Sequence, residues 1–177
     1  NSCFADSYIF NHGDKTLVTP EIQLPSLNYA PITLSFWSKH VFENQFECKD
    51  GGLLEISLKD GTYWTPIPEE NLLTVPYDGL ISSEHQNPLG NQRAWCGTRE
   101  WSRVAVLLDD YAGQSVRLRW RLGTDDSTQE GVGWYVDDVA VTSCTHPPPP
   151  GVMLQPLSSR VSGPPNGQVV HSLEVSN

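Results

Sequence analysis

The chain has 177 residues, which is long enough to bury a hydrophobic core in one domain and to add a short appendage. Its 21 acidic residues against 11 basic ones give a formal net charge of -10, and no basic cluster is present that could follow a phosphate backbone. A nucleic-acid partner is therefore not expected. The longest apolar runs have the length of a strand, so no membrane span is predicted either.

Hydrophobic residues alternate with polar ones in several short segments, in the chain order "ITLSFW" (32–37), "LLEISL" (53–58), "RVAVLL" (103–108), "SVRLRWRL" (115–122) and "GWYVDDVAV" (133–141). A period of two is typical of strands that bury one face. Asp60-Gly61 has the composition of a hairpin turn, and residues 111–114 separate two of the strands. No sustained helical period is present. The pattern predicts an all-β, two-sheet antiparallel β-sandwich.

The composition changes after Cys144. "THPPPPG" (145–151) is typical of a stiff proline-rich linker, so we expect the first domain to span residues 1–144. Residues 152–177 contain one good strand, "GQVVHSLEVSN", and are too short to bury a core of their own. They are expected to be the first strand of a further domain, or a strand that pairs with an exposed sheet edge of this chain or of a neighbour.

Four cysteines are present, and none lies in the close spacing typical of zinc or thiol redox sites: Cys3, Cys48, Cys96 and Cys144. Disulfides in a secreted protein are the favoured interpretation, with buried free thiols in a cytosolic protein as the alternative. Three pairings are allowed. We favour Cys3 with Cys144, linking the first strand to the last, and Cys48 with Cys96, joining two long loops. The first residues lack the pattern of a signal peptide, so an exported protein would have lost its leader.

Several segments together carry a resemblance to a known family: "LVTPEIQLP" (17–25), "NPLGNQRAWCG" (87–97), "DDYAGQSVRLRWRLGTDDS" (109–127), and the first and last strands "CFADS" (3–7) and "YVDDVAVTSC" (135–144). In this order they resemble the MAM-like jelly-roll module appended to secreted bacterial peptidases of the immune-inhibitor-A and subtilisin-like kinds. The resemblance implies a non-catalytic, extracellular jelly roll that often carries calcium. The tail resembles the opening strand of the immunoglobulin-like repeats that follow such modules.

The adjacent acids Asp137 and Asp138 lie inside an apolar strand, where neighbouring side chains point to opposite faces. Asp137 shares its parity with Val139 and Val141, so it is expected to point into the core, where a bare carboxylate is costly. A structural Ca²⁺ ion would remove that cost. Its predicted further ligands, in order of preference, are Asp6, Asp50, Glu43 and Asp125. The alternative is that backbone amides or a tyrosine satisfy Asp137 without a metal.

Six tryptophans are many for this length, and an exposed indole is a surface on which a sugar ring can stack. Trp120 and Trp134 are expected in the core. Trp37, Trp64 and Trp101 are the candidates for a carbohydrate-binding surface, although burial is the more ordinary fate of large aromatics.

No enzymatic activity is predicted, because the five histidines are scattered and no nucleophile, base and orienting group come together. The sequence instead predicts a secreted, calcium-stabilised adhesion or targeting module of a larger extracellular protein. Two alternatives stay open. The first is a carbohydrate-binding module. The second is a subunit of an extracellular fibre, in which residues 152–177 donate a strand to a neighbouring copy. The arginine row Arg117, Arg119 and Arg121 is expected to pair with local acids rather than with a partner.

Overall fold

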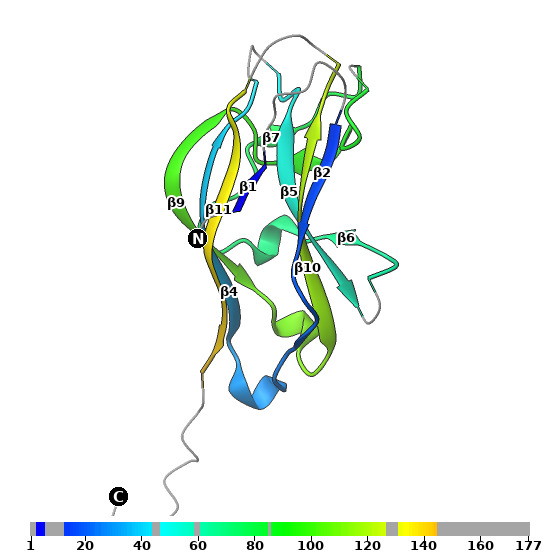
Figure 1. Cartoon of the computed structure of the whole chain (residues 1–177). Coiled ribbons are helices and arrows are strands. Elements are labelled where there is room, and N and C mark those ends of the chain that lie inside the picture. Colours follow the sequence, from blue (N-terminus) through cyan, green and yellow to red (C-terminus); the bar gives the residue numbers. More distant parts are fainter. Residues whose placement is uncertain are drawn as a thin grey trace, which may run out of the picture. The chain divides into compact units, whose positions relative to one another are not determined.

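The structure is a computed structural model, and it describes residues 13–43, 47–58, 61–84, 86–126 and 131–144, together with the backbone of residues 3–5 (Figure 1). The chain divides into two compact units, Asn1–Thr145 and His146–Asn177. The predictions made for the linker 145–151 and for the strand within 152–177 fall outside the described residues.

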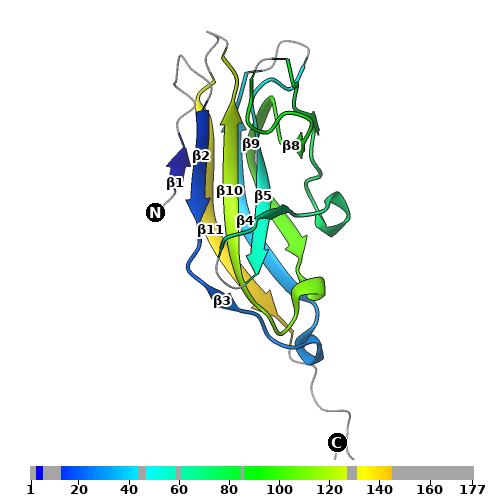
Figure 2. The same cartoon turned by 90° about the vertical axis from the view of Figure 1, so that its right-hand side faces the viewer.

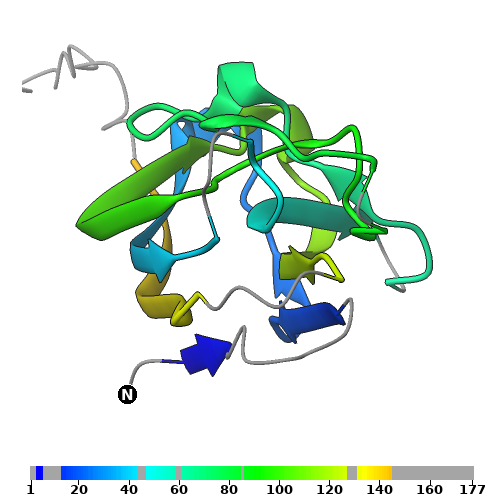
Figure 3. The same cartoon turned by 90° about the horizontal axis from the view of Figure 1, so that it is seen from above.

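The first unit contains two antiparallel sheets that face each other. In spatial order the four-stranded sheet comprises β1 (Cys3–Ala5), β11 (Gly133–Ser143), β4 (Ile32–Val41) and β9 (Thr98–Leu107). The five-stranded sheet comprises β2 (Gly13–Val18), β10 (Ser115–Thr124), β5 (Gly51–Leu58) and β6 (Thr65–Pro66), with β3 (Ile22–Gln23) also paired to β10. Figures 2 and 3 show the sheets from the side and from above, as two layers. The predicted all-β sandwich is confirmed.

The remaining elements are short. β7 (Gly79–Leu80) and β8 (Arg93–Ala94) form a two-stranded ribbon, and three 3₁₀ turns cover Leu27–Tyr29, Glu69–Asn71 and Asp109–Tyr111. Within the described part of the chain, no helix has the length and hydropathy needed to cross a membrane.

The core lies between the two sheets and follows the predicted alternation. On β10, Val116, Leu118, Trp120 and Leu122 are buried and the arginines between them are not. On β4 the buried hydrophobic residues are Ile32, Leu34 and Phe36. The ring of Phe36 meets that of Trp120 edge to face across the two layers, with centroids 5.2 Å apart. Such aromatic contacts stabilise the packing of the sheets beyond the area that they bury.

A long connection from Ile67 to Gly97 packs along the edge of β5. The backbones of Gly52 and Trp95 exchange two hydrogen bonds of 2.9 and 2.8 Å, and the Tyr77 hydroxyl donates to the carbonyl of Ile67 at 3.3 Å. A disulfide joins Cys48, before β5, to Cys96, at the end of this connection. The predicted Cys48–Cys96 bridge is confirmed, and it fixes the connection against the sandwich.

The second predicted bridge, Cys3 to Cys144, is wrong in this structure. The first strand does pair with the last, as expected, but Cys3 lies opposite Val136, eight residues before Cys144. Eight residues of strand span roughly 26 Å, whereas the Cα atoms of a disulfide lie no more than about 7 Å apart. Cys144 is an exposed free thiol.

Candidate functional site

A β-bulge in β11 decides where the two adjacent aspartates point. Asp137 lies opposite Trp37 of β4, but the next paired residue of β11, Ala140, lies opposite Ser35. β11 therefore has one more residue than β4 in this interval, and Asp138 takes a left-handed backbone conformation with φ of 50°. One inserted residue reverses the alternation of a strand from that point on.

The prediction that Asp137 points into the core is wrong because of this bulge. Before the bulge the core-facing residues are Trp134 and Val136, so Asp137 shares the outer face with Tyr135. After the bulge Val141, opposite Leu34, packs against the core, while Val139 is 41% exposed. Asp137 is half-buried and Asp138 is exposed, so both carboxylates lie on the outside of the four-stranded sheet.

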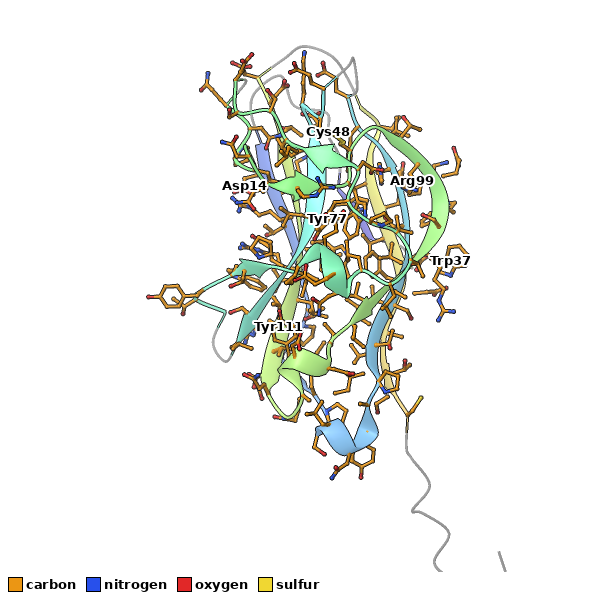
Figure 4. The ribbon with its side chains drawn as sticks, turned by 180° about the vertical axis from the view of Figure 1, so that it is seen from behind. Asp14, Trp37, Cys48, Tyr77, Arg99 and Tyr111 are labelled. Carbon is orange, nitrogen blue, oxygen red and sulfur yellow. A yellow bond between two sulfur atoms is a disulfide. The ribbon has the colours of Figure 1, made fainter. Side chains whose placement is uncertain are left out.

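The two aspartates share this outer face with two tryptophans. Trp37 and Trp101 are 41% and 44% exposed, so the burial that the sequence made the more ordinary expectation does not apply to either. Together with Asp137 and Asp138 they line an open hollow of about 230 Å³. Figure 4 shows Trp37 on the outer side of β4. We call the surface made by Trp37, Trp101, Tyr135, Asp137 and Asp138 the tryptophan face.

Trp101 extends the tryptophan face toward the end of β4. Its ring centroid lies 6.2 Å from that of Tyr135. The same two residues line a second hollow of about 350 Å³ with Lys39, Val41 and Val132. The sequence interpretation missed Tyr135, although its parity with Asp137 placed the two on one face.

Trp64, the third predicted sugar-binding tryptophan, lies with the other sheet. The guanidinium group of Arg119, on β10, lies over its indole, with the guanidinium carbon 4.3 Å from the ring centroid. Arg119 in turn donates to Glu55 of β5 at 2.5 Å. Trp37, Trp64 and Trp101 therefore do not form one binding surface.

Two residues of the arginine row, Arg119 and Arg121, pair with local acids, as expected, whereas no ion pair of Arg117 is found among the described residues. Arg121 makes two hydrogen bonds to the carboxylate of Asp14, of 2.8 and 2.7 Å, and its guanidinium lies 3.6 Å from Glu55. The bond from Arg121 lowers the pKa of Asp14. Arg119 and Arg121 are thus neutralised by acids of their own sheet.

Three of the predicted calcium ligands lie elsewhere, at one end of the sandwich. Glu43 follows β4, Asp50 precedes β5 and Asp125 follows β10, and each is at most 4% exposed. The backbone N–H of Asp125 donates to Oδ1 of Asp50 at 2.8 Å, and Lys49 donates to Glu43 at 3.2 Å. We call these three residues the acidic cluster.

Burial raises the pKa of the Asp50 carboxyl to about 6. The negative charges of Asp125 and Glu43 act in the same direction, while the hydrogen bond from the backbone of Asp125 opposes it. The structure thus divides the predicted ligands. Asp137 pairs with Trp37 of β4. Trp37 precedes Glu43 by six residues, which is roughly 20 Å of strand, so Asp137 is far from the acidic cluster. Asp6 lies outside the described residues.

Within the described residues, no group of three or more acidic, histidine or cysteine side chains is arranged to hold a metal ion. A calcium ion remains a prediction. Glu43, Asp50 and Asp125 do not form a metal site by themselves, so an ion at the acidic cluster would need further ligands, such as the predicted Asp6.

A family model described as Reelin subrepeat B matches residues 3–142, which include all of the sandwich except the last residue of β11, and both tryptophans of the outer face. A comparison with curated proteins finds no match for the chain. Reelin repeats are extracellular, non-catalytic β-domains, so the match agrees with the sandwich and with the disulfide.

Proposed function

Because the chain belongs to the Reelin subrepeat B family, we propose that it is a non-catalytic extracellular adhesion or targeting module that holds its partner on the tryptophan face. The observation behind this proposal is the position of Trp37 and Trp101, two tryptophans that are 41% and 44% exposed and line one hollow with two carboxylates. Tryptophan is enriched among the interface residues that dominate binding energy, and here two of them lie together around one hollow.

The contrast between the two sheets supports the choice of face. On the five-stranded sheet, Trp64 is covered by Arg119, and Arg119 and Arg121 pair with acids. On the four-stranded sheet, Trp37 and Trp101 keep more than two fifths of their surface accessible. A partner that covers them would bury apolar area that is now hydrated.

The experiment compares binding of the full chain to the surface of cultured cells and to extracellular matrix, for the wild type and the Trp37→Ala/Trp101→Ala variant. Both residues are on the outer face, so thermal unfolding should change little. Binding should be lost in this variant and kept in Trp64→Ala, the matched control on the other sheet. Unchanged binding by the double variant would refute the proposal.

Carbohydrate is a second candidate ligand for the same face, because a sugar ring can stack on an exposed indole. The two hollows of about 230 and 350 Å³ are side by side at Trp101, which lines both. Glycan-array binding that Trp37→Ala or Trp101→Ala abolishes would favour this ligand. Trp64 is no longer expected to contribute.

The predicted structural calcium ion stays part of the proposal, at the acidic cluster and with ligands in addition to its three described carboxylates, which do not form a metal site by themselves. Calcium takes six to eight oxygen ligands, for which carboxylates are suited. Glu43, Asp50 and Asp125 come from three separate segments, so an ion that they shared would fix the ends of β4, β5 and β10 relative to one another. Asp6 stays a predicted fourth ligand.

A further inference from the structure

We infer that the ligand of the tryptophan face is a cationic side chain, arginine or lysine, carried by a basic segment of a protein partner. This inference rests on the proposed function, since it names the chemistry of the partner that this same face would hold. It is drawn from the juxtaposition of Trp37 and Trp101 with Asp137 and Asp138 around one hollow.

The two indoles supply one half of the recognition. Tryptophan is the aromatic side chain that attracts a cation most strongly, through the negative face of its ring. A guanidinium can also stack flat on an indole, as Arg119 does on Trp64 at 4.3 Å on the opposite sheet. Trp37 and Trp101 are exposed enough for a cation to stack on them. Among the described residues, no arginine or lysine lies over either ring.

The two carboxylates supply the other half. The bulge turns both Asp137 and Asp138 outward, where a regular strand would expose only one of them. Among the described residues, neither aspartate makes an ion pair. The one hydrogen bond that joins them, from the backbone N–H of Asp138 to Oδ1 of Asp137, leaves the other carboxylate oxygens facing the hollow or solvent.

The described cations nearest to the two aspartates do not form ion pairs with them. Lys39 pairs with Glu100 at 2.8 Å. Arg103, opposite Trp37, makes a hydrogen bond of 3.4 Å to the neutral hydroxyl of Ser35 and keeps its charge. Asp137 and Asp138 together carry one more charge than Arg103 can balance, and neither is within ion-pair distance of it. The net charge of -10 adds an attraction for basic partners at longer range.

The charge of the hollow favours a basic side chain over a glycan. Sulfated and sialylated glycans are anionic, so Asp137 and Asp138 would repel them. A neutral sugar could donate hydroxyl hydrogen bonds to the two carboxylates, but it would not supply the positive charge that a guanidinium or an ammonium group brings.

The test is an NMR titration of the full chain, ¹⁵N-labelled, with three short capped peptides that differ at one position: arginine, lysine or citrulline. Citrulline has nearly the shape of arginine without its charge. The arginine peptide should shift the indole signals of Trp37 and Trp101 and leave those of the other four tryptophans unchanged. The lysine peptide should shift the same two signals, and the citrulline peptide should bind at least about threefold more weakly, the scale of an exposed ion pair.

The Asp137→Asn/Asp138→Asn variant should lose affinity for the arginine peptide by about three- to tenfold. The matched control, Glu70→Gln/Glu84→Gln, removes two charges from exposed positions elsewhere and should change the affinity less than twofold. Equal binding of the arginine and citrulline peptides, or an equal loss in both variants, would overturn the inference.

The outcomes also separate this inference from the proposed function. If a neutral oligosaccharide shifts the two indole signals and the basic peptides do not, the inference fails while the binding role of the face stands. If neither ligand shifts them and the Trp37→Ala/Trp101→Ala variant still binds to cells, both fail.

Discussion

The backbone N–H of Asp138 donates a hydrogen bond of 2.8 Å to the side-chain oxygen Oδ1 of Asp137. This bond lies in the bulge where Asp138 has a φ of 50°. Aspartate tolerates the left-handed region better than most residues, because its short polar side chain can bond locally. The pair therefore stabilises the irregularity that sends both carboxylates to the outer face.

The backbone of Asp138 leads to a first prediction. Asp138→Gly should change the free energy of unfolding by less than about 1 kcal/mol, because glycine adopts a positive φ without strain. Asp138→Val should lower it by about 1–2 kcal/mol, because a β-branched residue is strained there. Urea denaturation measures both.

The control for this pair is Ala140→Val, an exposed position just beyond the bulge, where φ is not positive. It should be nearly neutral. If Asp138→Val is as stable as the wild type, the backbone at residue 138 is not left-handed in solution.

The buried His40 predicts a pH dependence of stability. Burial lowers the pKa of His40 to about 4 from an ordinary value of 6.5. Between these two values the unfolded chain binds more protons at this residue than the folded chain. The free energy of unfolding should therefore rise by about 2–3 kcal/mol through His40 as the pH increases from about 4 to 6.5.

Substitution isolates this contribution from other titrating groups. His40→Phe and His40→Gln both remove the titration, and glutamine can still donate to the carbonyl of Cys96, which lies 3.3 Å from the His40 ring nitrogen. The difference in unfolding free energy between wild type and either variant should shift in favour of the wild type from pH 4.5 to pH 7.5. A constant difference would show that His40 is not buried and neutral.

The disulfide between Cys48 and Cys96 gives a third prediction. It closes a loop with a sequence separation of 48 residues, for which the chain-entropy model gives about 4 kcal/mol. The Cys48→Ala/Cys96→Ala variant should lose stability on this scale in urea denaturation. The control Cys144→Ala should have almost no effect, because Cys144 is exposed and free.

The free thiol of Cys144 can be tested directly. In the folded, unreduced protein, Cys144 should react with an alkylating reagent while Cys48 and Cys96 do not, which peptide mapping by mass spectrometry would show. A peptide in which Cys3 is linked to Cys144 would restore the pairing that the strand register argues against.

Much of the fold was predictable because alternation reports burial directly. On β10 the side chains of Val116, Leu118 and Trp120 have one neighbouring sheet to pack against, and their period of two is preserved. On β5 the same rule fails, since Glu55 is on the outer face yet 4% exposed. Arg119, on the neighbouring strand, pairs with its carboxylate, and residue spacing within β5 carries no signal of that contact.

The site was less predictable, because a single inserted residue changes the face of everything after it. Parity counted back from Val141 assigns Asp137 to the core, and parity counted forward from Val136 assigns it to the surface. The structure follows the second count up to the bulge. An Asp-Asp pair in an apolar strand was itself the signal of a bulge, since aspartate is one of the few residues that tolerate a positive φ.

Removal of calcium gives the last prediction. If the acidic cluster holds a structural ion, calcium at about one hundred times its dissociation constant should stabilise the chain by about 3 kcal/mol, and a chelator should reverse the gain in melting temperature. The Asp50→Asn/Asp125→Asn variant should fold without calcium but show no such shift, because the carboxamides keep the shape and lose the charge that binds the ion. The Asp137→Asn/Asp138→Asn variant should keep the full shift, because these aspartates lie on the tryptophan face. The opposite result, a calcium shift that is lost in Asp137→Asn/Asp138→Asn and kept in Asp50→Asn/Asp125→Asn, would place the ion at Asp137 and Asp138, as the sequence predicts.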